Sequence, residues 1–380
     1  MIYLNNASTS YPKPIEVVNS VNEYLSLPPV NFGRSGVIMG DKNIVNDLRQ
    51  KVSKFFHADD SYYVVFNSGS TESLNLAVNG LDLAGTEVII TSTEHNSLIR
   101  PLKNLENKGK ISIITVPCDA TGFVIPENIE KSVNSRTSLI CVNHCSNVTG
   151  TVQNVAKISE IARKKGVKLL VDGSQASGNL IIDFRKFMPD IYVFTAHKSL
   201  YGLQGSGGVL FKKELNLSPF KLGGTGAMSH LLTQPDEFPY KYESGTMNIP
   251  ALVALSTGLD WINKVGLENI IAHKKNLTQT FINELEHLQN IKFYYNSESS
   301  SGTIVSFTID NIPNDDVNYI LQNSFDIAIR SGLHCAPIIH QHLKTYPSGT
   351  LRISPSFFST EDEIYTTSKA IISIIEGYNG

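Results

Sequence analysis

The sequence predicts an α/β fold with two domains: a larger one built on a mostly parallel sheet flanked by helices, and a smaller α+β domain toward the C-terminus. The main observation is that apolar, strand-like runs alternate with helical patterns between residues 87 and 171, as in parallel sheets with right-handed crossovers. The length of 380 residues suffices for two domains and a large core. A hydrophobic content of 41% and a charged content of 18% are ordinary for a globular protein.

The chain begins with a short apolar run, a turn-rich stretch and two helices. Pro12 and Pro14 end any regular structure before residue 15. The spacing of apolar residues predicts a helix over 15–25 and another over 41–57, with Asp41 as the cap of the second. We expect the second helix to be a scaffold element.

A strand over 62–66 leads into a run of small residues and then into a helical pattern. The run contains Ser70 and Thr71, and a helix start of this kind gathers backbone N–H groups and hydroxyl donors at one point, which suits a phosphate. The simpler interpretation is a helix cap with Glu72 in the first turn. Taken alone, this stretch favours the cap.

Strands and helices then alternate regularly. The strands are expected at 87–92, 111–116, 138–143 and 168–172, and the helices at 96–108 and 156–165. His95 follows the first of these strands, and Asn147 follows the third. Parallel strands end at the same edge of a sheet, so both side chains are expected at that edge.

The stretch from residue 169 to 211 carries the most distinctive polar groups. One apolar run ends at Asp172, and the next delivers Thr195, His197 and Lys198 into a loop of small residues, while Gln175 follows the aspartate. An acid and a lysine placed in this way suit pyridoxal phosphate, whose aldehyde forms a Schiff base with lysine and whose ring nitrogen stays protonated beside a carboxylate. The glycine-rich segment 205–208 is followed by a strand, which excludes a dinucleotide loop.

The last third of the chain predicts the smaller domain. Helices are expected at 251–264, 268–288, 314–323 and 360–376, with strands near 292–295 and 303–309. We expect the large domain to span 15–255 and the small domain to combine 1–14 with 256–380.

Charge and hydropathy narrow the class of protein. The net charge is −3 with no basic block, which gives no support for nucleic-acid binding. No apolar run approaches a membrane span, and the first residues lack the pattern of a signal peptide. The expected location is therefore the cytoplasm, with no membrane partner.

The four cysteines predict no disulfide framework and no metal site. Cys141 and Cys145 are close in sequence, but Cys141 continues a strand and no second ligand pair with zinc spacing is present. A Cys/His hydrolase built on His144 and Cys145 is also unfavourable, since adjacent strand residues point to opposite faces. Cys335 differs from the others because glycine and proline surround it, as in a loop.

The motifs VDGSQA at 171–176 and TAHKSLYG at 195–202 resemble those of the class V aminotransferases, in the cysteine desulfurase and selenocysteine lyase branch, and are most similar to group II desulfurases. The resemblance spans nearly the whole chain. It implies the fold type I of pyridoxal-phosphate-dependent transferases, with a seven-stranded sheet, and pyridoxal 5′-phosphate as the cofactor.

The resemblance also implies roles at the cofactor. Lys198 would bind the aldehyde and act in catalysis, Asp172 would face the ring nitrogen, and His95 would stack on the ring and take part in catalysis. Asn147 would contact the ring oxygen and the substrate. The other cofactor-binding positions are Ser70, Thr71, Gln175, Thr195, His197 and Thr246. Thr246 would reach the neighbouring subunit of a homodimer.

Two segments of the small domain resemble substrate motifs. RSGLHCAP resembles the catalytic cysteine loop, with Cys335 as the nucleophile, and the strand around Arg352 resembles the one that holds the substrate carboxylate. The implied reaction converts L-cysteine to L-alanine and leaves a persulfide on Cys335, for a sulfur-acceptor protein and iron–sulfur cluster assembly. His334 is one candidate for activating the thiol.

Three alternatives stay open. The substrate could be L-selenocysteine, a difference of one atom that depends on details of the pocket. The chain could be another class V lyase or aminotransferase for which Cys335 is incidental. It could also be a sulfur carrier or assembly partner that uses the fold mainly for binding.

Overall fold

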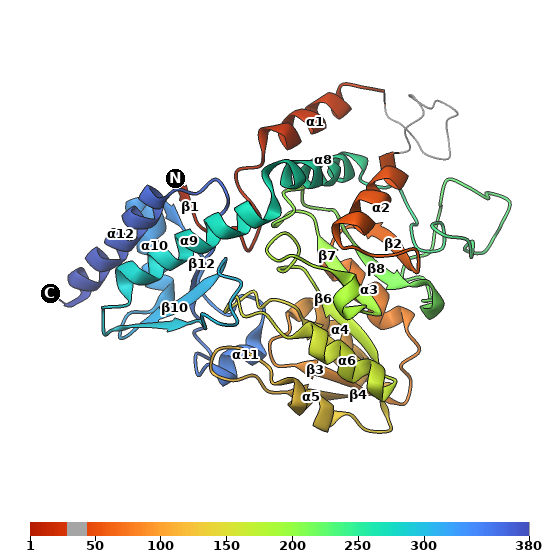
Figure 1. Cartoon of the computed structure of the whole chain (residues 1–380), viewed down its shortest axis with the longest axis horizontal. Coiled ribbons are helices and arrows are strands. Elements are labelled where there is room, and N and C mark those ends of the chain that lie inside the picture. Colours follow the sequence, from red (N-terminus) through yellow and green to blue (C-terminus); the bar gives the residue numbers. More distant parts are fainter. Residues whose placement is uncertain (29–43, 380) are drawn as a thin grey trace.

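The computed structural model describes residues 1–28 and 44–379 (Figure 1). The predicted cap at Asp41 lies outside the described residues. Of the two helices near the N-terminus, α1 (Ile15–Leu25) has the predicted bounds, and α2 (Ile44–Phe55) ends two residues before the predicted end.

A seven-stranded sheet forms the centre of the larger part of the molecule. Its strands are β2 (Tyr62–Asn67), β3 (Thr86–Thr91), β4 (Ile111–Val116), β5 (Thr137–Asn143), β6 (Lys168–Asp172), β7 (Ile191–Thr195) and β8 (Gly207–Lys212). Their order is β2-β8-β7-β6-β5-β3-β4, and only β8 runs against its neighbours. The mostly parallel seven-stranded sheet expected from the sequence is confirmed.

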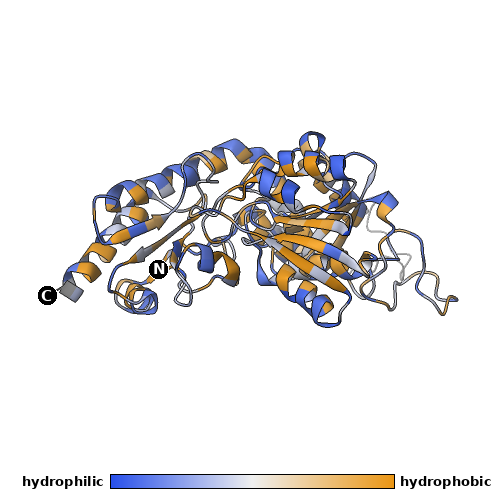
Figure 2. Ribbon diagram, turned by 90° about the horizontal axis from the view of Figure 1, so that it is seen from below, coloured by the Kyte–Doolittle hydropathy of each residue, from blue (hydrophilic) through white to orange (hydrophobic). Residues whose placement is uncertain are grey.

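The strands of this sheet are apolar on both faces. Side chains of successive residues, such as Ile89 and Ile90, enter two different hydrophobic clusters on opposite sides of the sheet. Figure 2 shows the apolar strands enclosed between helices with polar outer faces. The covering helices are α3 (Ser70–Gly80), α4 (Asn96–Asn107), α5 (Pro126–Ser132), α6 (Val155–Lys165), α7 (Phe184–Phe187) and α8 (Ile249–Val265).

The C-terminal part is built on a three-stranded antiparallel sheet. Its order is β12 (Leu351–Ile353), β10 (Val305–Ile309) and β9 (Ile291–Tyr294). The helices are α9 (Leu267–Leu285), α10 (Asn314–Phe325), α11 (Pro337–His342) and α12 (Glu361–Asn379). A third hydrophobic cluster joins α9, α10 and α12 to this sheet.

The N-terminal residues belong spatially to the C-terminal part. Strand β1 (Ile2–Tyr3) pairs in parallel with β11 (Ile327–Ala328), and the Asn6 N–H donates to the Ser354 carbonyl at 3.0 Å. Figure 1 accordingly shows β1 beside the blue C-terminal elements. This pairing places residues 5–8 next to the strand that carries Arg352.

The domain boundary at 255 stays a prediction. Residue 255 lies inside α8, which runs without a break from Ile249 to Val265. Within the described ranges, no helix has the length and apolarity needed to cross a membrane.

Candidate active site

A cavity of about 310 Å³ opens where β3, β5, β6 and β7 end and α3 begins. Most of the residues proposed from the sequence line it: Ser70, Thr71, His95, Asn147, Asp172, Gln175, Thr195, His197, Lys198 and Arg352. The carboxyl end of a parallel sheet is where open α/β folds bind ligands. Thr246 is exposed, and neither it nor Cys335 lines the cavity.

Lys198 lies three residues beyond the end of β7, among groups of both charges. Burial is the main cause that lowers the pKa of Lys198 to about 8; the guanidinium groups of Arg352 and Arg330 contribute to this lowering, and Asp172 opposes it. A lysine with this pKa is free amine to roughly a tenth at pH 7, and the free amine is the form that attacks carbonyls or accepts protons.

Asp172 ends β6, the strand beside β7, and is 3% exposed. Its Oδ1 accepts the backbone N–H of Ser174 at 2.9 Å and also the Ser174 hydroxyl. The Ser174 hydroxyl is in turn 2.6 Å from the Ser70 Oγ. Ser174 therefore links the strand-end carboxylate to the beginning of α3.

His95 is both a helix cap and a lining residue of the cavity. Its Nδ1 accepts the Ser97 N–H at 3.1 Å and contacts the Ser97 hydroxyl. Because Nδ1 is an acceptor there, the proton of the neutral ring is on Nε2. Burial lowers the pKa of His95 to about 4, and the positive charge of Lys198 acts in the same direction, so the ring is neutral near pH 7.

The N-terminus of α3 forms a cradle beside these groups. Its first N–H groups have no acceptors within the helix, and Ser70 and Thr71 line the cavity. Gly69 has a φ of +134°, and a Cβ on Gly207 would lie 2.7 Å from the Gly69 Cα. A side chain at Gly207 would therefore clash with the backbone that leads into α3.

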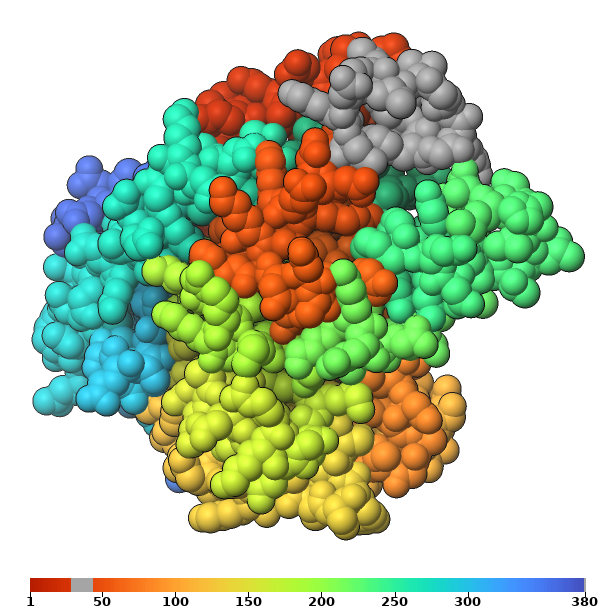
Figure 3. Space-filling view, turned by 45° about the vertical axis from the view of Figure 1, so that its right-hand side comes forward, coloured from red at the N-terminus to blue at the C-terminus, as the bar shows by residue number. Residues whose placement is uncertain are grey.

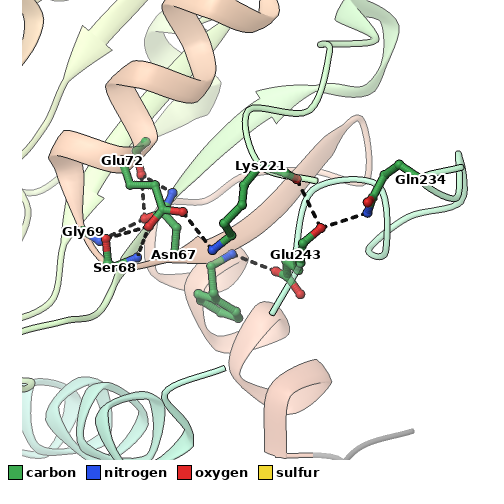
Figure 4. Close-up of polar contacts among 10 residues, drawn as sticks. Asn67, Ser68, Gly69, Glu72, Lys221, Gln234 and Glu243 are labelled. Carbon is green, nitrogen blue, oxygen red and sulfur yellow. Dashed lines mark hydrogen bonds and ion pairs between the residues drawn. The ribbon is translucent and has the colours of Figure 1, made fainter. Parts of the chain in front are cut away.

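A carboxylate in the first turn of α3 is engaged by neighbouring groups (Figure 4). Glu72 Oε2 accepts the backbone N–H and the hydroxyl of Ser68, and Oε1 lies 3.2 Å from the Lys221 Nζ. Burial alone would raise the pKa of Glu72, but these hydrogen bonds and the Lys221 ammonium lower it. The negative charge of Glu72 is therefore partly balanced by Lys221 and the Ser68 donors.

The segment that precedes Thr246 is held by contacts with residues of α2 and β2. Glu243 forms an ion pair with Arg49 and accepts the Phe66 N–H. The Gln234 amide donates to the Ser244 hydroxyl (Figure 4). The Arg49–Glu243 pair is nearly buried, with side-chain exposures of 10% and 5%. These contacts fix the position from which Thr246 projects.

Arg352 is fully buried at the opposite wall. Its Nη1 donates to the Asn147 carbonyl at 2.7 Å, and its Nη2 donates to the Asn5 Oδ1 at 3.0 Å and to the Ser8 Oγ at 3.1 Å. Burial and the nearby Arg330 lower the pKa of Arg352 to about 9, which leaves the guanidinium charged at pH 7.

Cys335 is the one exposed cysteine among the described residues. Its carbonyl accepts the Asn96 N–H at 2.8 Å, next to His95, and its Sγ lies 3.5 Å from the Arg330 Nη2. His334 and Cys335 have φ values of +49° and +59°, so the loop turns through two left-handed residues. The sulfur is thereby placed beside a residue that lines the cavity.

The suggestion that His334 activates the thiol is wrong. The His334 ring is buried and its Nε2 lies 3.0 Å from both oxygens of Thr350, while its backbone carbonyl accepts from Asn147. Burial holds the pKa of His334 well below its ordinary value, so the ring carries no charge near neutrality. The cation beside the sulfur is Arg330.

His144 and Cys145 form no hydrolytic pair. Cys145 is buried, with its Sγ directed to the carbonyls of Ser146 and Gly150, and His144 Nδ1 lies 3.3 Å from the Tyr192 hydroxyl. Burial lowers the pKa of His144 to about 4 and raises the pKa of Cys145 to about 11. In the described part of the chain, no group of three His, Cys, Asp or Glu side chains could hold a metal ion.

Several lining residues were not predicted from the sequence. They are Ala7, Ser8, Ser68, Gly69, Glu72, Ser97, Asn143, Ser174, Gln204, Gly205 and Arg330. Arg330 is the first residue of the motif RSGLHCAP, five residues before Cys335. This nearness in sequence was the signal that could have identified it. The role of Ser8 gave no local signal because the two arginines that donate to its hydroxyl are more than 300 positions away in sequence.

The cavity fits pyridoxal 5′-phosphate. Five lining residues carry a buried polar atom with no hydrogen-bond partner in the described structure, namely Asn143 Oδ1, Asn147 Oδ1, Gln175 Oε1, His197 Nδ1 and Arg352 Nε. Buried polar groups normally have partners, so unpaired atoms that surround a cavity indicate a polar ligand. A lysine, a strand-end carboxylate and a helix N-terminus are the groups that such a cofactor needs.

Comparisons with known proteins agree with this geometry. The model of the family "Aminotransferase class-V" matches residues 2–366. A probable cysteine desulfurase of Methanothermobacter thermautotrophicus is 32% identical, with 96% of this chain and 92% of that protein covered. A cysteine desulfurase of Wigglesworthia glossinidia brevipalpis is 30% identical, with 98% of this chain and 92% of that protein covered.

Solved structures give the same result. The apo structure of a cysteine desulfurase from Thermococcus onnurineus has a TM-score of 0.87 and 27% identity, and the match covers 99% of this chain and 95% of that one. A cysteine desulfurase from Escherichia coli, in an S-sulfonic acid form, has a TM-score of 0.87 and 26% identity, covering 98% and 94% of the two chains. The chain belongs to the class V aminotransferase family, whose members depend on pyridoxal phosphate.

Proposed function

We propose that the chain is a pyridoxal-phosphate-dependent cysteine desulfurase that converts L-cysteine to L-alanine and transfers the sulfur to Cys335 as a persulfide. The observation that carries this proposal is the position of the exposed Cys335 thiol, which lies 3.5 Å from the Arg330 guanidinium. Arg330 lines the same cavity as Lys198 and Arg352. The desulfurase names of relatives that match nearly the whole chain support it.

The cofactor, when bound, supplies an aldehyde that captures amines and a ring that accepts electrons from the substrate. Lys198 would hold the aldehyde, Asp172 would face the ring nitrogen, and the neutral His95 ring would cover the ring face. The N-terminus of α3, with Ser70 and Thr71, would hold the phosphate. Gln175, Thr195, His197 and Asn147 would complete the cofactor site.

The chain's own residues bind the substrate and move its protons. The Arg352 guanidinium binds the α-carboxylate and fixes the orientation of the amino acid. Lys198, as free amine, would remove the proton from the substrate α-carbon and, as an ammonium group, would carry that proton for its later return to the substrate. Asn147 connects Arg352 with the cysteine loop, since its carbonyl accepts from the Arg352 guanidinium and its side-chain amide donates to the His334 carbonyl.

Cys335 receives the sulfur. Its thiolate attacks the substrate sulfur, the substrate carbon–sulfur bond breaks, and the departing carbon takes a proton to give the methyl group of alanine. The overall change is L-cysteine plus the Cys335 thiol to L-alanine plus the Cys335 persulfide, with no external oxidant. The Arg330 Nη2 lies 3.5 Å from the Cys335 sulfur that makes this attack.

We also propose a homodimer in which Thr246 reaches the cofactor phosphate of the neighbouring subunit. Its exposure and its absence from the cavity of its own subunit support this role. A sulfur-acceptor protein would then collect the persulfide from the exposed Cys335. The cytoplasmic location expected from the sequence stays a prediction.

The test is an assay of purified, cofactor-loaded protein for alanine and sulfide from L-cysteine and for alanine and selenide from L-selenocysteine. We expect wild type to process L-cysteine, and Cys335→Ser to lose that turnover while its cofactor absorbance stays unchanged. Turnover of selenocysteine alone would replace the proposal with a selenocysteine lyase. Alanine from neither substrate would leave a different class V activity or a binding role.

A further inference from the structure

A serine hydroxyl lies between the two arginines of the cavity. Ser8 Oγ accepts from the Arg330 Nη1 at 3.2 Å and from the Arg352 Nη2 at 3.1 Å, and it donates to the Asn5 Oδ1 at 2.7 Å. Ser8 itself lines the cavity. Its hydroxyl therefore occupies the space between two positive charges.

The segment that carries Ser8 is fixed on both sides. The Ser8 N–H donates to the Asn5 carbonyl at 3.0 Å, and the Ala7 N–H donates to the Ser354 hydroxyl at 2.8 Å. The Ala7 carbonyl accepts from the Gln175 amide at 2.8 Å. The position of the hydroxyl is thus set by the fold and is not that of a free surface loop.

The Nη2 nitrogen of Arg352 already has two acceptors. It donates to the Asn5 Oδ1 and to the Ser8 Oγ, and Nη1 donates to the Asn147 carbonyl. A carboxylate that binds a guanidinium with two parallel hydrogen bonds uses Nη2 together with Nη1 or Nε. It therefore competes with Asn5 and Ser8 for the Arg352 guanidinium.

Of the two acceptors, Ser8 is the one that keeps a charged donor, because Arg330 still donates to its hydroxyl after Arg352 is released. The hydrogen bonds of both guanidinium groups go to uncharged oxygens and to the Cys335 sulfur. An incoming carboxylate would supply the negative charge that these contacts lack.

We propose that Ser8 is a specificity-determining residue: its hydroxyl occupies the carboxylate position on Arg352 and is displaced when the substrate binds. This inference rests on the proposed function, because it assumes an amino-acid substrate. The hydroxyl stabilises the two neighbouring guanidinium groups while the site is free. It lowers the affinity for carboxylate-bearing ligands and leaves the affinity for amines unchanged.

The test measures binding of L-alanine and of ethylamine, which lacks the carboxylate, to the cofactor-loaded protein by calorimetry. We expect Ser8→Ala and Ser8→Gly to bind L-alanine about five-fold more tightly, the factor for one competing hydrogen bond. Ethylamine should bind both variants as it binds wild type. Ser8→Thr, which keeps the hydroxyl, should retain the wild-type affinity, and Ser20→Ala on α1 controls for the substitution itself.

An unchanged or weaker affinity for L-alanine in both Ser8→Ala and Ser8→Gly would overturn the inference. An equal gain for ethylamine would also overturn it, because the effect would not depend on the carboxylate. The proposed function is tested separately by turnover of L-cysteine. A protein that binds L-alanine more tightly without Ser8 but makes no alanine from L-cysteine would refute the desulfurase and retain the role of Ser8.

Discussion

Lys198 shows how one residue obtains its chemistry from its surroundings. Burial lowers its pKa to about 8, and the arginines of the substrate site contribute in the same direction. The groups that would bind an anionic substrate thus also favour the free amine on the lysine. Binding of a carboxylate would neutralise part of this positive charge.

Uptake of the cofactor by cofactor-free protein should therefore depend on pH with a midpoint near 8, because only the free amine attacks the aldehyde. Replacing Arg352 with Leu removes a positive charge that lowers the pKa of Lys198, so the midpoint should move upward. Stopped-flow absorbance across pH 6–10 measures it. An unshifted midpoint near 10 in wild type would contradict this account of Lys198.

Glu94 is a buried acid that the proposed mechanism does not use. It is fully buried, and its Oε1 accepts the Thr91 hydroxyl at 2.5 Å and the Asn143 N–H at 2.9 Å. Burial is the main cause that raises the pKa of Glu94 to about 8, and the negative charge of Asp172 contributes to this rise. The folded protein therefore holds this carboxyl in its protonated form at neutral pH.

A raised pKa in the folded state means that wild type loses stability as pH rises from the unfolded pKa, near 4.5, to about 8. Glu94→Gln mimics the protonated acid and has no such loss. The free energy of unfolding of Glu94→Gln, relative to that of wild type, should therefore increase by up to about 1 kcal/mol for each unit that the pH rises in this range. Urea denaturation at pH 5, 6, 7 and 8 tests this, and a difference that stays constant with pH would refute it.

At the residue scale, strand-end groups could be predicted and their partners could not. Asp172, His95 and Lys198 follow apolar runs that the sequence displays, so their convergence on one sheet edge follows from topology. Arg330 and Ser8 depend on contacts between segments that are distant in sequence. Periodicity and spacing carry no information about such contacts.

At the scale of elements, α9 connects the C-terminal part of the molecule to the lysine loop. Lys274 on α9 is 3% exposed, and its Nζ donates to the Asn179 Oδ1 and to the Ser199 Oγ, next to Lys198. Asn179 also donates to the Gln175 carbonyl at 2.8 Å. Burial lowers the pKa of Lys274 to about 7.

Lys274→Met tests this helix contact. Because the folded-state pKa lies below the ordinary 10.5, wild type gains stability as pH rises from about 7 toward 10.5, whereas methionine has no such dependence. The free energy of unfolding of the variant relative to wild type should fall by about 1 kcal/mol per pH unit over this range. Equal pH dependence of both proteins, measured by urea denaturation at pH 7–10, would show that Lys274 does not titrate there.

The long elements were predictable because their apolar patterns are strong. Helix α1 and strands β4 and β6 have the predicted bounds. Short elements such as α7 and α11, of four and six residues, were missed because so few residues show no periodicity. The pairing of β1 with β11 was missed because each strand has only two residues and the partners are far apart in sequence.

At the scale of the whole molecule, the segment before Thr246 extends from the body of the protein (Figures 1 and 3). It exposes apolar side chains, with Leu222 at 69% and Leu232 fully exposed. Such exposure is consistent with an interface between copies of the chain. It also agrees with the proposed contribution of Thr246 to a neighbouring site.

Mixed dimers test this arrangement. Lys198→Ala and Thr246→Lys should each be inactive as homodimers, the second because a bulky side chain enters the neighbouring phosphate site. A heterodimer of the two has one site with both defects and one site with neither, so it should recover about half of the wild-type activity. Activity assays on differently tagged, co-purified chains measure this, and no recovery would place Thr246 outside the partner's site.

The most direct test of the central claim is to identify the lysine that holds the cofactor. Borohydride reduction of the cofactor-loaded protein makes the link between aldehyde and lysine permanent, and peptide mapping by mass spectrometry locates it. The account predicts one modified peptide, with the added mass on Lys198, and no modification at that position in Lys198→Ala. A link on Lys13 or Lys274, or protein that binds no cofactor, would contradict it.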